Sequence, residues 1–94
     1  MDLLARPITN PVVIFKEQID NWAVLINLDT AASVALNPTG VVIWKMVDKN
    51  RNVSEIVTAV KNHFNNAPDT VADDVASLLG ELAEGGFVGY EEKL

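Results

Sequence analysis

Cysteine is absent from the 94-residue sequence, and this absence excludes several classes of function. Without thiols the chain forms no disulfide, thiolate metal site or iron–sulfur cluster, and it has no cysteine nucleophile. The single histidine, His63, has no second histidine with which to share a metal ion, and a histidine near a helix end is usually there for the helix dipole. No apolar run approaches the ~18 residues of a membrane span, and the first residues lack the regions of a signal peptide. We expect a cytoplasmic protein with no metal or membrane partner.

Basic residues are also few, with 7 Lys and Arg against 13 Asp and Glu, for a net charge of -6. The segment from Pro68 to Gly86 carries five acidic residues and neither lysine nor arginine. Such a surface repels nucleic acid, because DNA-binding proteins need basic contacts to phosphate. A small winged-helix regulator that binds DNA or a protein is therefore only the alternative hypothesis. Its basic patch would be Lys45, Lys49, Arg51 and Lys61.

The residues that usually perform catalysis are not arranged for it. The chain has no glycine-rich phosphate loop, and its serines lie outside any nucleophile elbow. Asp73 and Asp74 are adjacent, and consecutive helical residues point about 100° apart, so the two carboxylates do not share one proton or ion. We therefore expect a protein that is not an enzyme and that needs no cofactor.

Three short β-rich runs come first, at residues 12–15, 22–28 and 31–36. In the second run two sets alternate, as a strand with one buried face requires: Trp22, Val24, Ile26 and Leu28 against Ala23, Leu25 and Asn27. Asp20-Asn21 and Asp29-Thr30 supply the turns. The short connections predict a three-stranded antiparallel meander.

Three helices are predicted to follow. Asn37 and Asn52 are expected N-caps, the second in a capping box with Glu55. The first helix is expected to end at 48–50, the second at 65–68 and the third at Gly85-Gly86. The third helix has a predicted core stripe of Val71, Val75, Leu78 and Leu82, and residues 87–90 are expected to be extended.

These elements predict one α+β domain over residues 1–94, with the helices covering one face of the sheet and an ordered core at about 11–90. The first ten residues, which contain Pro7 and Asn10, are interpreted as a mobile lead-in.

Two features indicate a peptide partner. The third strand contains Ala32, Ser33, Val34 and Ala35 and carries no charge or proline that would protect a sheet edge, so a partner strand could pair there. Beside the core stripe, the third helix has a second row of Ala72, Ala76, Leu79 and Ala83, which could line a groove against this strand. Two alternatives are that residues 87–90 cover the edge, or that a second copy does so in a homodimer. With a free edge, we expect Val34→Pro to remove peptide binding.

The sequence "LNPTGVVIWKMVDKNRNVSEIV", followed by "DDVASLLGELAEGGFV", resembles the coenzyme PQQ synthesis protein D family (PqqD-like proteins), the prototype of the RiPP recognition element. The resemblance covers roughly residues 12 to 88. Its matching positions are Leu36-Asn37, Thr39-Gly40, Ile43-Trp44, Asp48, Val53, Glu55-Ile56, Gly86 and Phe87-Val88.

The resemblance implies a winged-helix-like fold and a non-catalytic peptide chaperone. Such a protein binds the leader of a ribosomal precursor peptide as an added strand and delivers it to a modifying enzyme, often a radical SAM enzyme with a SPASM domain. Carried over by position, the binding cleft would be formed by Ala32, Ser33, Val34, Ala35, Ala72, Val75, Ala76, Leu79, Leu82 and Ala83.

Overall fold

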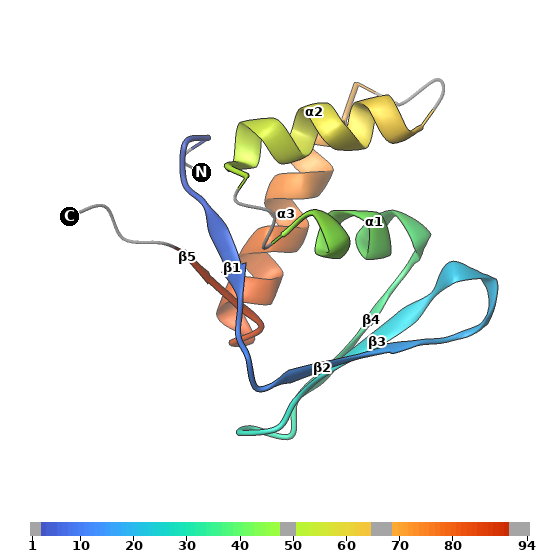
Figure 1. Ribbon diagram of the computed structural model, residues 1–94, viewed down its shortest axis with the longest axis vertical. Coiled ribbons are helices and arrows are strands. Elements are labelled where there is room, and N and C mark those ends of the chain that lie inside the picture. The colour runs from blue at the N-terminus through green and yellow to red at the C-terminus, as the bar shows by residue number, and fades with distance from the viewer. Residues whose placement is uncertain (1–2, 48–50, 65–68, 91–94) are drawn as a thin grey trace.

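The computed structural model describes residues 3–47, 51–64 and 69–90 (Figure 1). Its strands are β1 (Pro7–Thr9), β2 (Val13–Glu17), β3 (Ala23–Asn27), β4 (Ser33–Leu36) and β5 (Val88–Tyr90). Its helices are α1 (Pro38–Met46), α2 (Val53–His63) and α3 (Val71–Glu84), and a 3-10 turn, η1 (Ile19–Asn21), joins β2 to β3. Strands β2, β3 and β4 form an antiparallel sheet in that order, so the predicted α+β fold with a meander and three helices is confirmed.

Hydrogen bonds fix which residues of β3 pair with each neighbour. On one side, the Leu28 N–H donates to the Val12 carbonyl (3.2 Å). On the other side, the Asn27 N–H donates to the Ala32 carbonyl (2.9 Å). Hydrogen-bonded and non-bonded pairs alternate in an antiparallel ladder. The odd-numbered residues of β3 therefore bond to β4, and the even-numbered ones bond to β2.

One face of the sheet is buried beneath the helices. Ala23, Leu25 and Asn27 are almost completely buried, whereas Trp22 and Leu28 remain 45% and 62% exposed. The predicted alternation is therefore present, and the face with the larger apolar side chains is the one that points away from the helices.

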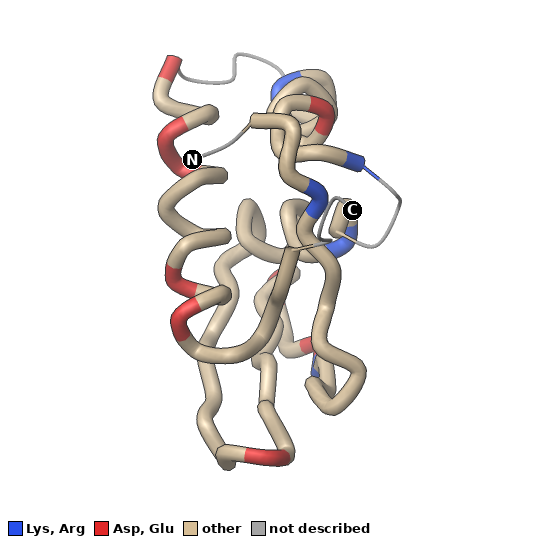
Figure 2. Tube along the Cα trace, turned by 90° about the vertical axis from the view of Figure 1, so that its left-hand side faces the viewer, with Lys and Arg blue, Asp and Glu red and all other residues tan. Residues whose placement is uncertain are grey.

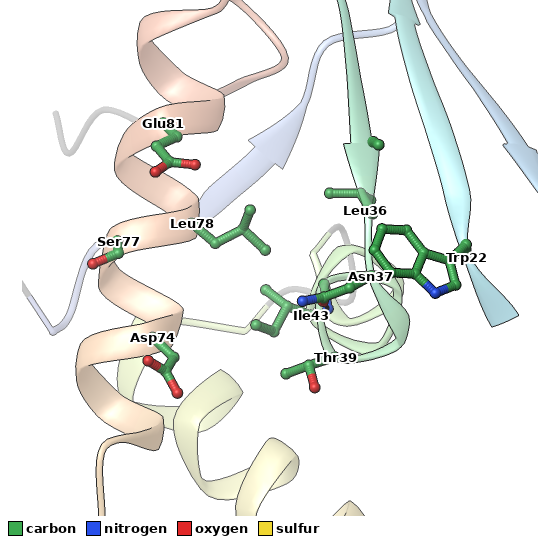
Figure 3. Close-up of a pocket in the computed structure, with 11 residues that line it drawn as sticks. Trp22, Leu36, Asn37, Thr39, Ile43, Asp74, Ser77, Leu78 and Glu81 are labelled. Carbon is green, nitrogen blue, oxygen red and sulfur yellow. Dashed lines mark hydrogen bonds between the residues drawn. The ribbon is translucent and has the colours of Figure 1, made fainter.

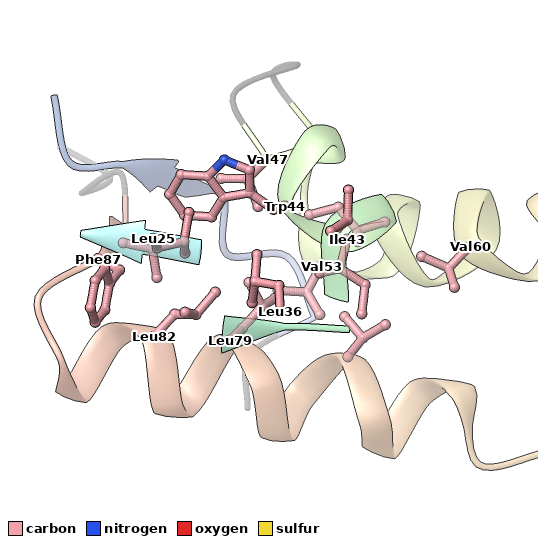
Figure 4. Packing of buried hydrophobic residues seen from close by; sticks show 14 of the residues in the cluster. Leu25, Leu36, Ile43, Trp44, Val47, Val53, Val60, Leu79, Leu82 and Phe87 are labelled. Carbon is pink, nitrogen blue, oxygen red and sulfur yellow. The ribbon is translucent and has the colours of Figure 1, made fainter. Parts of the chain in front are cut away.

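The core lies between this sheet face and the three helices. Leu25 and Leu36 from the sheet meet Ile43, Leu79 and Leu82 from the helices (Figure 4). The predicted core stripe of α3 was wrong at one position, because Leu79 is fully buried while Leu78 is only half-buried. Trp44 is buried and packs in this core. None of the described helices has the length and apolar character needed to cross a membrane.

The predicted helix N-caps are confirmed. The Asn37 side chain accepts from the Gly40 N–H (2.8 Å), and Asn52 and Glu55 form a reciprocal capping box. At the end of α3, Gly86 adopts a φ of 78°, which glycine tolerates best. The predicted ends of the first two helices, at 48–50 and 65–68, lie outside the described residues.

The interpretation of a mobile lead-in was wrong for residues 3–10, the described part of that segment. Strand β1 pairs antiparallel with β5, in the register Pro7 with Tyr90. The carbonyls of Leu3 and Ala5 accept the first two N–H groups of α2, from Ser54 (3.0 Å) and Val53 (2.9 Å). A helix start has free N–H donors, so the N-terminal segment helps to hold α2 in place.

Candidate functional site

Strand β4 forms one edge of the three-stranded sheet. Within the described part of the chain it pairs with β3 alone. The alternative in which residues 87–90 cover this edge is not what the structure shows, because β5 pairs with β1 instead. The backbone of β4 is therefore available to another strand.

The register identifies the outward-facing backbone groups of β4. Val34 is paired with Leu25 and Leu36 with Ala23, and these are hydrogen-bonded positions. The N–H and C=O groups of Ser33 and Ala35 consequently point away from β3, toward the free edge. The Val34 N–H is directed at β3, so Val34→Pro would break the sheet itself. Ala35 is the informative position for a proline substitution.

A groove of about 590 Å³ lies beside this edge, between β4 and α3 (Figure 3). Its lining residues come from the end of β4, from α1 and its N-cap, from one face of α3 and from the residue before β3. They are Trp22, Ala35, Leu36, Asn37, Thr39, Gly40, Ile43, Asp74, Ser77, Leu78 and Glu81.

The groove has an apolar floor and an acidic rim. Leu36 and Ile43 are each 1% exposed, and half-buried Leu78 points toward them from α3. Asp74 and Glu81 lie on the groove side of the same helix, one on each side of Leu78 (Figure 3). Acidic residues occur near both ends of α3, which contains no basic residue (Figure 2).

The structure brings only part of the sequence-derived site to this groove. On β4, Ala35 lines the groove, Ser33 is exposed, and Val34 is half-buried toward the core. Ala32, just before β4, is also exposed.

On α3, Val75, Leu79 and Leu82 lie in the core and are at most 1% exposed. The structure leaves Ala72, Ala76 and Ala83 outside the groove lining. The helix face that does line it is Asp74, Ser77, Leu78 and Glu81. This face has the helical spacing i, i+3, i+4, i+7 but mixes polar with apolar residues. A search for an all-apolar row therefore selects a different face.

Trp22 is another groove residue that was not predicted from the sequence. It precedes β3, and its indole lies near the end of β4 beside Leu36 and Asn37 (Figure 3). The sequence does contain a signal for Trp22, a large aromatic residue directly after the Asp20-Asn21 turn. This signal becomes informative only when the buried face of β3 is known.

The site offers unpaired backbone groups beside an apolar surface. Within the described ranges, no three residues among His, Asp and Glu come together as metal ligands do. Of the proposed DNA-binding patch, Lys45 pairs with Glu17 (3.2 Å) and lies over the Phe15 ring, while Lys49 is outside the described residues. An open strand edge beside an apolar groove can hold an extended peptide segment.

The fold and the groove define a small winged-helix-like α+β domain with a strand edge open for pairing. Residues 23–88 match the family described as Coenzyme PQQ synthesis protein D (PqqD), and the chain belongs to this family. No curated protein matches the sequence.

Two solved structures share the fold with a TM-score of 0.74, and each alignment covers 90% of this chain and 99% of the other. The first is TbiB1 in complex with the TbiA(beta) leader peptide, at 27% identity. The second is a lasso peptide synthetase B1 complexed with the leader peptide, at 18% identity, a level at which the likeness concerns the fold.

Proposed function

We propose that this protein is a non-catalytic peptide chaperone. It binds the leader segment of a ribosomally made precursor peptide as an added strand along β4 and presents it to a modifying enzyme. The observation that carries the proposal is the unpaired edge of β4 facing α3 across an apolar groove. The family match and the leader-peptide complexes of similar structures support it.

The binding free energies expected from the β4 edge and from the groove indicate that the two must act together. Ser33 and Ala35 offer two donors and two acceptors, and each net hydrogen bond contributes about 1 kcal/mol. The sum, about 4 kcal/mol, falls well short of the roughly 8 kcal/mol of a micromolar complex. Burial of a large apolar side chain adds about 1.5–3 kcal/mol. Backbone pairing alone is therefore insufficient, and a side chain in the groove, over Leu36 and Leu78, would supply part of the difference.

The recipient enzyme in this proposal is a radical SAM protein with a SPASM domain. Membership of the PqqD family supports this choice. This chain has no cysteine, so every thiolate ligand of an iron–sulfur cluster would come from the enzyme.

The first step of the test is a search for a short precursor-peptide gene near the gene of this protein. Isotope-labelled protein is then titrated with a synthetic leader of that precursor. Amide signals of Ser33–Leu36 and of the groove face of α3 are expected to shift. Ala35→Pro is expected to reduce affinity at least tenfold, because proline removes an outward N–H from the edge. Glu17→Pro on β2, at the opposite edge of the sheet, is the matched control and should bind normally. Unchanged affinity in a folded Ala35→Pro variant would contradict strand addition.

A further inference from the structure

We propose that the groove selects leader segments in which one large apolar side chain lies between two basic side chains. This inference rests on the proposed function, since it concerns which peptides the same groove accepts. The arrangement of charge and apolar surface along α3 carries it.

The acidic groups flank the apolar seat along the helix. Asp74 comes four residues before Leu78, and Glu81 comes three residues after it. With a rise of 1.5 Å per residue, the two acidic positions are about 10 Å apart along the helix axis. Both side chains lie on the groove side of α3 (Figure 3).

Neither carboxylate has a cationic partner in the described structure. The Thr70 hydroxyl donates a long hydrogen bond to Asp74 (3.4 Å), and Glu81 makes no ion pair with a described residue. No lysine or arginine lines the groove. A guest with lysine or arginine would supply the missing counter-charge, whereas an acidic guest would be repelled.

The floor provides one apolar seat between these charges. Leu36 and Ile43 form its buried base and Leu78 forms its wall on α3. The exposed Trp22 lies at the side of the groove near the end of β4. A leucine-sized or aromatic side chain would be desolvated there, with hydrophobic contacts on both walls.

The spacing of a strand matches this pattern. Side chains on one face of a strand recur every second residue, so positions i and i+4 are about 13 Å apart. The flexible stems of lysine and arginine span the difference of about 3 Å from the acidic positions. The preferred peptide sequence is therefore basic–x–apolar–x–basic, where x is any residue. The side chains at the x positions face the other side of the sheet.

The test compares two synthetic peptides that are identical except at the flanking positions. One carries the core Lys-Thr-Leu-Thr-Lys and the other Glu-Thr-Leu-Thr-Glu in the same serine- and threonine-rich host. Fluorescence anisotropy should show roughly tenfold tighter binding of the lysine peptide by the unmodified protein. The preference should shrink as salt is raised, because partly exposed charge pairs are screened.

Charge reversal in the protein distinguishes the groove from the overall charge. Asp74→Lys with Glu81→Lys is expected to reverse the peptide preference. Asp73→Lys with Glu84→Lys changes the net charge equally on the same helix, but these residues are outside the groove lining, so the original preference should persist. Circular dichroism confirms that both double variants keep their helices.

The outcomes separate this inference from the proposed function. Equal binding of the two peptides by the unmodified protein overturns the charge selection. A peptide preference that changes equally in the two double variants overturns it as well. If Ala35→Pro still removes binding in that case, strand addition stands without it. Failure of both peptides to bind the unmodified protein at millimolar concentration overturns the selection rule. Failure of the natural leader as well overturns the proposed function.

Discussion

Asn27 is a buried polar residue that links the β3–β4 turn to the C-terminal end of α3. It is 2% exposed, and its side chain amide donates to the Gly86 carbonyl at the end of α3 (3.0 Å). Its side-chain oxygen accepts from the N–H groups of Asp29 (2.9 Å) and Thr30 (3.3 Å), in the turn before β4. One side chain therefore fixes the β3–β4 turn relative to the C-terminal end of α3.

Asn27→Ala should lower the free energy of unfolding by about 2–3 kcal/mol, because it removes three hydrogen bonds of a buried side chain, each worth about 1 kcal/mol. Urea unfolding measures this loss. Asn62→Ala, at an exposed position of α2, is the control and should change stability by less than about 0.5 kcal/mol. Similar unfolding curves for the two variants would contradict a linking role for Asn27.

Tyr90, the only tyrosine, provides a prediction at alkaline pH. Its hydroxyl is buried without a hydrogen-bond partner among the described residues, and this burial raises its pKa above 10.0. In the alkaline range the unfolded chain therefore loses the phenolic proton first and binds fewer protons than the folded one. Stability falls as pH rises from the unfolded pKa through the folded one.

Comparing urea unfolding at about pH 8 and about pH 10.5 should show a larger loss for the unmodified protein than for Tyr90→Phe. Absorbance titration of the single phenol should give a midpoint above 10.0. An equal loss of stability in both proteins would contradict this account.

At the scale of elements, the two adjacent leucines of α3 should have separable roles. Leu78→Ala is expected to reduce leader affinity roughly tenfold and to cost only about 1 kcal/mol of stability, because Leu78 is half-buried and lines the groove. Leu79→Ala is expected to cost about 2–4 kcal/mol of stability, because Leu79 is fully buried. Peptide titration measures the effect on affinity, and urea unfolding measures the effect on stability. An equal loss of affinity in the two variants, calculated per folded molecule, would contradict the assignment of Leu78 to the groove and Leu79 to the core.

Local patterns in the sequence predicted the elements and most of the buried positions, but they did not distinguish between neighbouring rows of α3. The Asn37 cap and the Asn52–Glu55 capping box were predictable because each depends on residues three apart. The choice between Leu78 and Leu79 depends on how α3 packs against the rest of the fold, because both rows of the helix are apolar. The mixed face with Asp74 and Glu81 was missed for the same reason.

Long-range pairing was likewise outside what the sequence pattern could predict. Strand β1 is three residues long, and its partner lies at the other end of the chain, with Pro7 opposite Tyr90. A strand this short gives almost no periodic signal. The edge of β4, by contrast, was predicted because short connections dictate the order of the meander.

At the scale of the whole molecule, the N-terminal segment joins regions that are distant in sequence. Leu3 and Ala5 hold the start of α2, and β1 pairs with β5. The Asn10 side chain also donates to the Gly86 carbonyl (3.0 Å), the same acceptor that Asn27 uses. The groove lies on other elements, between β4 and α3. Stability and peptide binding should therefore respond differently when this segment is changed.

Removal of residues 1–9 should lower the free energy of unfolding by roughly 3 kcal/mol, since it uncovers the first N–H groups of α2 and removes the partner strand of β5. Urea unfolding measures this loss. Where the truncated chain remains folded, its leader affinity should stay within about threefold of the full chain, because no groove residue is removed. Ile8→Thr, at an exposed strand position, is the control and should leave both properties nearly unchanged. Unaltered stability after truncation would contradict a structural role for the segment, and a large loss of affinity in the folded truncated chain would show that the segment also shapes the groove.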